Sequence, residues 1–123
     1  MNRVVHFEFA AVEPARAAEF YRQVFGWEIT SWPGQEEYFL VTTGPIDQPG
    51  INGGIMRHQD AQPRTVNTIE VDSLDDYAAK VKQHGGTVVV EKQVIPGVGY
   101  QIYCKDTEGN LFGVHQADPN AQP

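Results

Sequence analysis

The stretch DTEGNLFGVHQ, residues 106–116, carries the most information about the fold. Its first five residues favour a turn, and the alternating residues that follow favour a strand. Two features of that strand are unusual: Gly113 stands where a side chain would normally pack, and His115 follows on the same face. The stretch therefore predicts the closing hairpin of a sheet. It leaves open whether a metal site or a substrate pocket lies at that edge.

Together with the residues before it, this stretch completes a pattern that occurs twice, at a period of about 60 residues. Each copy begins with an alternating strand, continues with an amphipathic helix and ends with three strands. The strands are predicted at residues 3–10, 27–32, 36–44, 51–58, 64–71, 87–95, 99–106 and 110–116, and the helices at 13–26 and 73–86. Both copies are needed, because neither could bury its helix and its sheet face alone.

The predicted fold class is α+β, in which two βαβββ units form a curved mixed sheet around a cavity, with the helices on its outer face. Residues 1–116 are predicted to form one domain, with units at about 1–60 and 61–116. Residues 117–123 form a polar tail with no reason to be ordered. Gly26 is expected to end the first helix in a left-handed conformation, and Ser73 and Asp76 have the spacing of a capping box.

The composition excludes several classes of protein. The net charge of −7 argues against a nucleic-acid partner, because clustered lysines and arginines are absent. Cys104 is the only cysteine, so neither an internal disulfide nor a thiolate metal cluster can form. No apolar run approaches the roughly 20 residues of a membrane span, and the N-terminus does not resemble a signal peptide. The expected protein is therefore cytoplasmic.

Three motifs, in their order and spacing, resemble the vicinal oxygen chelate superfamily. They are HFEF…EPARAAEFYRQVFGW at residues 6–27, INGGI at 51–55 and DTEGNLFG at 106–113. The superfamily includes glyoxalase-type lyases, extradiol dioxygenases, fosfomycin-resistance enzymes and bleomycin-binding proteins, and the closest similarity is to its small, largely uncharacterised glyoxalase-related members. The resemblance covers residues 4–116. It implies paired βαβββ units and a homodimer, but a fold shared by many chemistries does not choose one reaction.

The resemblance also implies a divalent metal, held by one His or Glu-type ligand from the first and fourth strands of each unit. Such an ion needs oxygen and imidazole donors that converge from rigid strands and leave positions open for two substrate oxygens. His6 matches the first ligand position. The others fall near Gly53 or Gly54, Val66 and Gly113, which offer no donor. The usual metal site is therefore expected to be absent, and no cofactor is expected; a divalent metal on another subset of residues is the less favoured alternative.

Strand alternation places His6, Glu8, Glu70 and His115 on the predicted cavity side. Glu8 or Glu70 is the candidate catalytic base, because a carboxylate on an inward face must be paired, solvated or protonated. His6, His115 and Tyr100 are candidate substrate-binding residues, the tyrosine because it follows the loop PGVG. The alternative for the carboxylates is a salt bridge or a wet pocket wall, and for the other three it is ordinary packing or hydrogen bonding.

Three hypotheses for function follow. The first is a glyoxalase- or dioxygenase-like enzyme, a lyase or isomerase, that acts on a small oxygenated metabolite. The second is a metal-free protein that sequesters a small ligand, for which the acidic balance favours a cation. The third is a non-catalytic interaction module. Metal content and ligand binding separate them.

Overall fold

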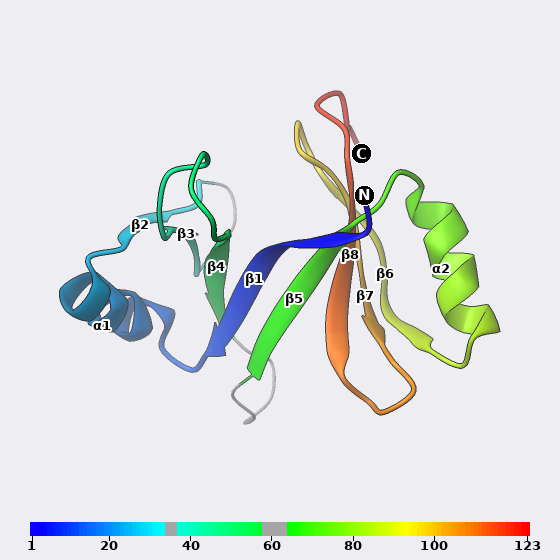
Figure 1. Ribbon diagram of the computed structural model, residues 1–123, viewed down its shortest axis with the longest axis horizontal. Helices are drawn as coiled ribbons and strands as arrows, with labels where there is room; N and C mark the ends of the chain where they lie inside the picture. The colour runs from blue at the N-terminus through cyan, green and yellow to red at the C-terminus, as the bar shows by residue number, and fades with distance from the viewer. Residues whose placement is uncertain (34–36, 58–63) are drawn as a thin grey trace. The chain divides into compact units, whose positions relative to one another are not determined.

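The computed structural model describes residues 1–33, 37–57 and 64–123, in which eight strands and two helices lie. The chain divides into two compact units. The N-terminal unit is His6–Val66, and the C-terminal unit is Asn67–Pro123 together with Met1–Val5. The predicted α+β class with two βαβββ units is confirmed (Figure 1). Residues 36 and 58, which end two of the predicted strands, lie outside the described residues.

The N-terminal βαβββ unit contains a mixed sheet with the strand order β2-β3-β4-β1. Its elements are β1 (Arg3–Ala11), α1 (Pro14–Phe25), β2 (Glu28–Ser31), β3 (Tyr38–Thr42) and β4 (Asn52–Arg57). The first and fourth strands run parallel, so that Glu8 pairs with Gly54, whereas β3 is antiparallel to both β2 and β4. This register fixes which side chains of β1 and β4 share a face.

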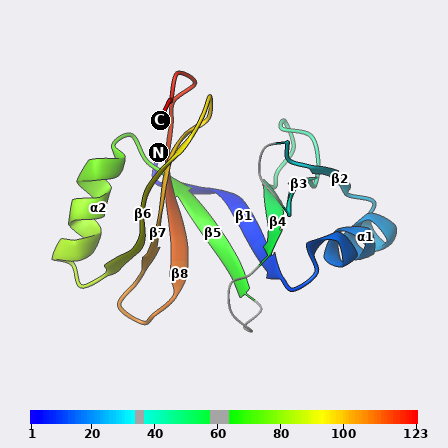
Figure 2. The same ribbon diagram turned by 180° about the vertical axis from the view of Figure 1, so that it is seen from behind.

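The C-terminal unit repeats this topology with the strand order β5-β8-β7-β6 (Figure 2). Its elements are β5 (Arg64–Glu70), α2 (Leu74–Gln83), β6 (Thr87–Ile95), β7 (Gly99–Lys105) and β8 (Leu111–Ala117). The first and fourth strands are again parallel, and Thr68 pairs with Gly113. Glu8 and Thr68 therefore hold equivalent positions in the two units, as do Gly54 and Gly113. No helix among the described residues is long and apolar enough to cross a membrane.

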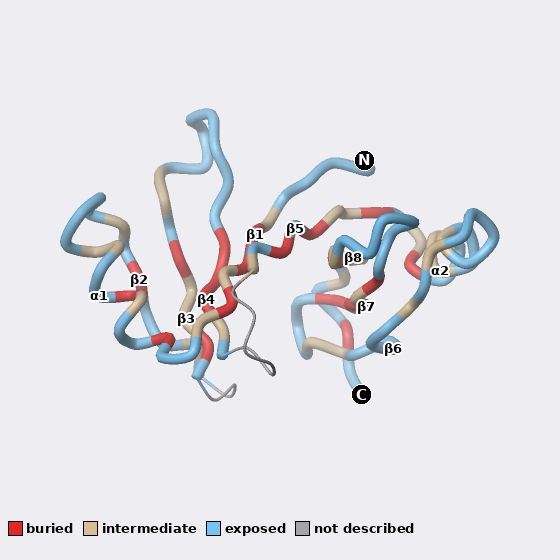
Figure 3. Tube along the Cα trace, turned by 90° about the horizontal axis from the view of Figure 1, so that it is seen from below, coloured by how far each residue is buried: buried red, intermediate tan, exposed pale blue. Residues whose placement is uncertain are grey.

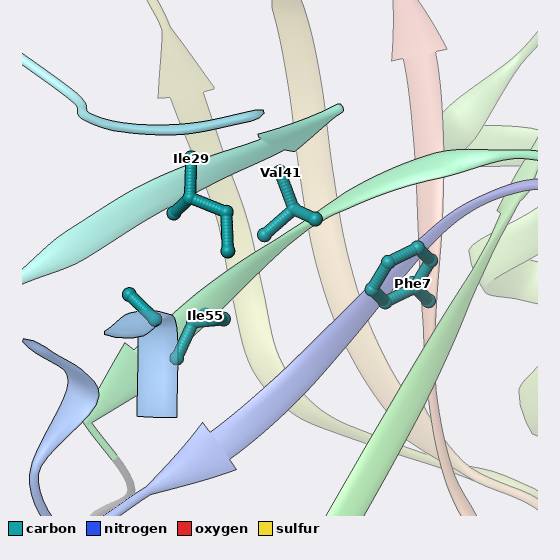
Figure 4. Close-up of a cluster of buried hydrophobic side chains, with 5 residues drawn as sticks. Phe7, Ile29, Val41 and Ile55 are labelled. Carbon is teal, nitrogen blue, oxygen red and sulfur yellow. The ribbon is translucent and has the colours of Figure 1, made fainter. Parts of the chain in front are cut away.

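Each unit buries an apolar cluster between its helix and one face of its sheet. In the N-terminal unit the cluster consists of Phe7, Ala18, Ile29, Val41 and Ile55, and Figure 4 shows four of these side chains pointing toward one another. In the C-terminal unit the cluster consists of Val71, Leu74, Ile102, Cys104 and Val114. In β3, β4 and β7 buried residues lie among more exposed ones (Figure 3), and in β4 three consecutive residues, 53–55, are buried. The opposite faces are left for polar side chains.

Both predicted helix boundaries are confirmed. Gly26 has a φ of 70° and ends α1 in the left-handed conformation, which glycine adopts without a steric penalty. At the start of α2, the Ser73 hydroxyl accepts a hydrogen bond from the Asp76 backbone N–H at 3.4 Å. Local sequence therefore determines where α1 ends and where α2 begins, while the apolar clusters hold the helices on their sheets.

The expectation that residues 117–123 have no order is wrong for most of this segment. Ala117 still belongs to β8, the Asp118 N–H donates to the Val98 carbonyl at 2.9 Å, and the Gly97 N–H donates to the Ala121 carbonyl at 3.1 Å. Ala121 is 1% exposed. The segment is polar in composition, but its backbone groups find partners in the β6–β7 turn, and backbone pairing does not depend on side-chain polarity.

The turn of the opening motif is built around one carboxylate. Asp106 Oδ1 accepts hydrogen bonds from the backbone N–H groups of Glu108 and Asn110, both at 2.9 Å, and Oδ2 accepts one from the Asn110 side chain. These hydrogen bonds stabilise the charged form and lower the pKa of Asp106. Asp106 and Asn110 thus close the β7–β8 hairpin. This structural role is enough to explain why these two residue types occur in the motif.

Candidate functional site

His6 and Glu8 lie on the face of β1 that points away from the cluster under α1. Phe7, between them, belongs to that cluster. Glu8 is only 5% exposed, and His6 is half-buried. Burying a carboxylate costs free energy unless it accepts hydrogen bonds or meets a charge. The groups that Glu8 contacts therefore determine what this face can do.

One of these groups is Tyr38, at the start of β3, which sequence reasoning did not single out. The Tyr38 hydroxyl donates to Glu8 Oε2 at 2.7 Å, and His6 Nε2 lies 3.1 Å from the same hydroxyl oxygen. Because the tyrosine proton is directed at the carboxylate, its oxygen accepts from His6, and Nε2 must carry a proton. Nε2 is the only ring nitrogen of His6 with a hydrogen bond in the described part of the chain. We call these three residues the Glu8–Tyr38–His6 chain.

Two adjacent glycines of β4 make this arrangement fit. A Cβ at Gly54 would lie inside the van der Waals radii of the Tyr38 hydroxyl and ring, so only glycine leaves room for the tyrosine to cross β4. A Cβ at Gly53, on the other face, would collide with the backbone carbonyl of Phe7 and with its ring. The position that the resemblance implies for a metal ligand is therefore not vacant. The Tyr38 hydroxyl occupies it.

Burial and charge act on His6 in opposite directions. Desolvation by burial lowers the pKa of His6 below its ordinary value of 6.5, and the negative charge of Glu8 raises it by a smaller amount, so the net change is downward. The imidazole is consequently neutral at pH 7 and can accept a proton. The unprotonated nitrogen is Nδ1, because Nε2 donates to Tyr38.

The equivalent face of the C-terminal unit carries a second set of polar side chains. Gln101 Nε2 lies 3.5 Å from Thr68 Oγ1, and Gln101 Oε1 lies 2.9 Å from His115 Nδ1. Gln101 precedes Tyr103, the partner of Gly113, by two residues, just as Tyr38 precedes Leu40, the partner of Gly54. Gln101 is thus the counterpart of Tyr38. Aligning the two repeats position by position is the sequence signal that could have identified both.

The remaining predicted residues are placed as follows. Glu70 pairs with His115 across β5 and β8, and its backbone carbonyl accepts a hydrogen bond from the Asn2 N–H. Tyr100 packs against the apolar cluster under α2, on the face opposite to Gln101, which agrees with the packing alternative for this residue. The PGVG loop suggested a pocket position for Tyr100, but strand alternation determines its face. His6 and Glu8 are brought together in one unit, and Glu70 and His115 in the other.

The residues present do not fit the four-ligand metal site that the resemblance implies. Tyr38 fills the place beside Gly54, Val66 is fully buried, and the Gln101 amide and Thr68 hydroxyl fill the place beside Gly113. Among residues 1–33, 37–57 and 64–123, no group of three or more His, Cys, Asp or Glu side chains is placed to hold a metal ion.

Comparison with known proteins defines the family. The sequence pattern of the Glyoxalase/Bleomycin resistance protein/Dioxygenase superfamily matches residues 3–114. The chain therefore belongs to this superfamily, as the motifs predicted. Fosfomycin resistance protein FosX of Listeria innocua is 27% identical over 85 residues, which make up 66% of this chain and 59% of FosX. The chain thus spans about three-fifths of the length of that curated relative.

Solved structures share the fold at low sequence identity. Methylmalonyl-CoA epimerase from Mycobacterium tuberculosis superposes with a TM-score of 0.71 at 16% identity, over 94% of this chain and 88% of the epimerase. Methylmalonyl-CoA epimerase from Streptomyces coelicolor, in complex with 2-nitronate-propionyl-CoA, gives a TM-score of 0.73 at 15% identity, over 100% and 99% of the two chains. At these identities the likeness establishes the fold and not the reaction.

Proposed function

We propose that this protein binds a small oxygenated metabolite and moves a proton at the carbon next to its carbonyl group, as a lyase or isomerase does. The observation that carries the proposal is the Glu8–Tyr38–His6 chain, which holds a neutral imidazole in one tautomer. A base that is fixed in tautomer and orientation, and neutral at the working pH, is what proton abstraction requires. Epimerisation, the activity named for the structural relatives, is one such reaction.

Each member of the chain has a separate role in this proposal. His6 Nδ1 takes the proton from the substrate carbon, and the ring becomes an imidazolium. Tyr38 keeps Nε2 in place, and the Glu8 carboxylate stabilises the new positive charge through the tyrosine hydroxyl. Glu8 is 5% exposed, so the structure favours a positioning role over the direct proton transfer predicted for it from the sequence. The electron pair of the broken C–H bond moves onto the carbonyl oxygen as an enolate, and the proton returns from Nδ1 to the same carbon, which completes the exchange.

The proposal is tested by deuterium exchange. Incubated in D₂O with methylmalonyl-CoA and a panel of short 2-oxo and 2-hydroxy acids, the protein is expected to introduce deuterium next to the carbonyl of at least one compound. The same rate is expected after dialysis against EDTA, because the donor set does not fit the family metal site. Mass spectrometry measures the gain of one mass unit. The proposal would be contradicted if no compound exchanged faster with the protein than in buffer alone. If EDTA abolished the exchange, the claim that the reaction needs no metal would be wrong.

Sequestration of a cationic ligand is the second candidate, favoured by the net charge of −7 and by the buried Glu8 carboxylate. Bleomycin, which gives the superfamily part of its name, is a suitable cationic probe. A saturable rise in melting temperature with bleomycin, without exchange on any compound of the panel, would support binding without turnover. The homodimer and the cytoplasmic location stay predictions, and light scattering of the purified protein tests the dimer.

A further inference from the structure

The INGGI motif contains the only asparagine of the sequence that is followed by glycine, Asn52 before Gly53, and the proposed reaction does not use its side chain. In such a pair the backbone nitrogen of the glycine can attack the asparagine side chain with little steric hindrance, because glycine has no Cβ. Gly53 cannot be exchanged for a bulkier residue, since a Cβ there would collide with the Phe7 backbone carbonyl. The chain therefore keeps a reactive asparagine at a position that the fold fixes.

Asn52 lies at the end of the paired part of β4. It is exposed and is the first residue of that strand. Its Cα partner in β1 is His6, whereas on the other side the β3–β4 register ends with Val41 opposite Gly53. Residues at the end of a strand ladder open with a smaller free energy than residues in its middle. Asn52 therefore meets water and can leave its strand conformation without unfolding of the whole sheet.

Thr43, the residue that follows β3, holds the Asn52 side chain. Its backbone N–H donates to Asn52 Oδ1 at 2.8 Å. Its hydroxyl donates to the Ile51 carbonyl at 2.7 Å and lies 3.3 Å from the same Oδ1. We call these contacts the Thr43 latch. The latch opposes ring closure, because the side-chain carbon of Asn52 must turn onto the Gly53 nitrogen, which is held in an extended strand.

We propose that Asn52 is a modification site, at which the chain deamidates in water when the Thr43 latch opens. The Gly53 nitrogen gives up its proton to hydroxide and bonds to Asn52 Cγ, and the Cγ–Nδ2 bond breaks. The amide nitrogen takes a proton from water and leaves as ammonia, so that a cyclic imide remains. Water then adds to either imide carbonyl and opens the ring to aspartate or isoaspartate. One water is consumed and one ammonia is released, and no atom is oxidised or reduced.

Both products alter the face on which His6 lies. Paired residues of adjacent strands share a face, so a carboxylate at position 52 lies on the same side of the sheet as His6. In isoaspartate the main chain gains a carbon atom immediately before Gly53, which displaces Gly53 and Gly54 from their places beside Phe7 and Tyr38. One product thus adds a negative charge to this face, and the other also disturbs β4. The deamidation itself does not depend on the reaction proposed for His6.

The reaction is measured by incubating the whole chain in mildly alkaline water labelled with ¹⁸O, because ring opening places a heavy oxygen at residue 52. Trypsin digestion in ordinary water and mass spectrometry of the peptides locate the label. Asn110 is the internal reference, since it is exposed, precedes Leu111 instead of a glycine and lies in another tryptic peptide. In urea, Asn52 is expected to take up ¹⁸O at least about tenfold faster than Asn110. In the folded chain Asn52 should react at least about tenfold more slowly than in urea.

Variants of Thr43 test the latch. Thr43→Val keeps the shape of the side chain and removes the hydroxyl, so it is expected to speed the uptake at Asn52 in the folded chain about three- to tenfold, the worth of one hydrogen bond. Uptake at Asn110, and the rate in urea, should not change. Thr43→Ser keeps the hydroxyl and should react like the unmodified chain.

The proposal is overturned if Asn52 reacts no faster than Asn110 in urea, or if folding does not slow the reaction at Asn52. It is also overturned if Thr43→Val leaves the rate at Asn52 unchanged, or raises the rate at Asn110 as well, which would indicate a general loosening of the chain. None of these results depends on deuterium exchange at His6.

Discussion

His6→Gln is expected to slow deuterium exchange by about 10²- to 10⁴-fold, the usual contribution of a general base. The glutamine retains an N–H that can reach the Tyr38 hydroxyl, but it offers no nitrogen that can take a proton. His84→Gln, at the exposed end of α2, is the matched control and should exchange at the full rate. Retention of more than about a tenth of the rate in His6→Gln would remove His6 from the mechanism.

Glu8→Gln separates positioning from direct catalysis within the same assay. The negative charge of Glu8 raises the pKa of His6, so removing it should lower that pKa further and move the acid limb of the rate profile to lower pH. A residue that only supports the fold would lower the rate at every pH without moving the limb. Tyr38→Phe, which breaks the link between Glu8 and His6, should lower the rate as well.

Gly53→Ala is expected to have the largest effect on stability of any single methyl addition in the N-terminal unit. The added Cβ collides with the Phe7 backbone carbonyl, which is held in β1 and cannot move away, so a loss of about 3 kcal/mol or more is expected. Gly54→Ala should cost about 1–3 kcal/mol, because its collision is with the Tyr38 side chain. Urea unfolding of the two variants measures both values.

A double-mutant cycle checks that Tyr38 is the cause of the second effect. Tyr38→Ala removes the colliding ring, so Gly54→Ala should cost much less in that background, with a coupling of about 1–3 kcal/mol. Gly53→Ala should show no such rescue. Gly44→Ala is the control, since nothing lies within 4 Å of its added methyl group. Additive losses for the pair Gly54→Ala and Tyr38→Ala would show that the tyrosine does not occupy the place beside Gly54.

Much of the fold was predictable because its signals are local. The alternation in β1, the capping residue Ser73 and the left-handed Gly26 each act over a few residues, and the repeat fixed how the elements are combined. The order of residues 118–121 was not predictable, because it comes from backbone hydrogen bonds to the β6–β7 turn. Composition carries no information about such pairing.

The candidate site was predictable only in part, for a related reason. His6 and Glu8 could be placed on one face by alternation, but the residue that joins them comes from a neighbouring strand 30 positions away from Glu8. The glycines at the expected ligand positions offer no donor, and the sequence alone gives no sign that another side chain lies beside them. The structure shows that each glycine makes room for a polar side chain from the next strand, Tyr38 beside Gly54 and Gln101 beside Gly113. A side chain that reaches across to a glycine of the neighbouring strand cannot be predicted from either strand alone.

The state of His6 also determines how stability depends on pH. Because burial lowers the pKa of His6 in the folded chain below 6.5, the unfolded chain binds more protons as the pH falls through that value. The contribution of His6 to stability is therefore complete above the unfolded pKa and decreases as the pH falls toward the folded one. In His6→Gln this part of the pH dependence should disappear.

The most direct test of the account is the protonation of the His6 ring, measured by long-range ¹H–¹⁵N spectra of the ¹⁵N-labelled protein during a pH titration. The Glu8–Tyr38–His6 chain predicts a proton on Nε2, an unprotonated Nδ1 at pH 7 and a pKa below 6.5. In Tyr38→Phe the ring proton of His6 should no longer be confined to Nε2. A proton on Nδ1 in the unmodified protein, or a pKa of 6.5 or above, would contradict the central claim that this chain holds His6 as a neutral base.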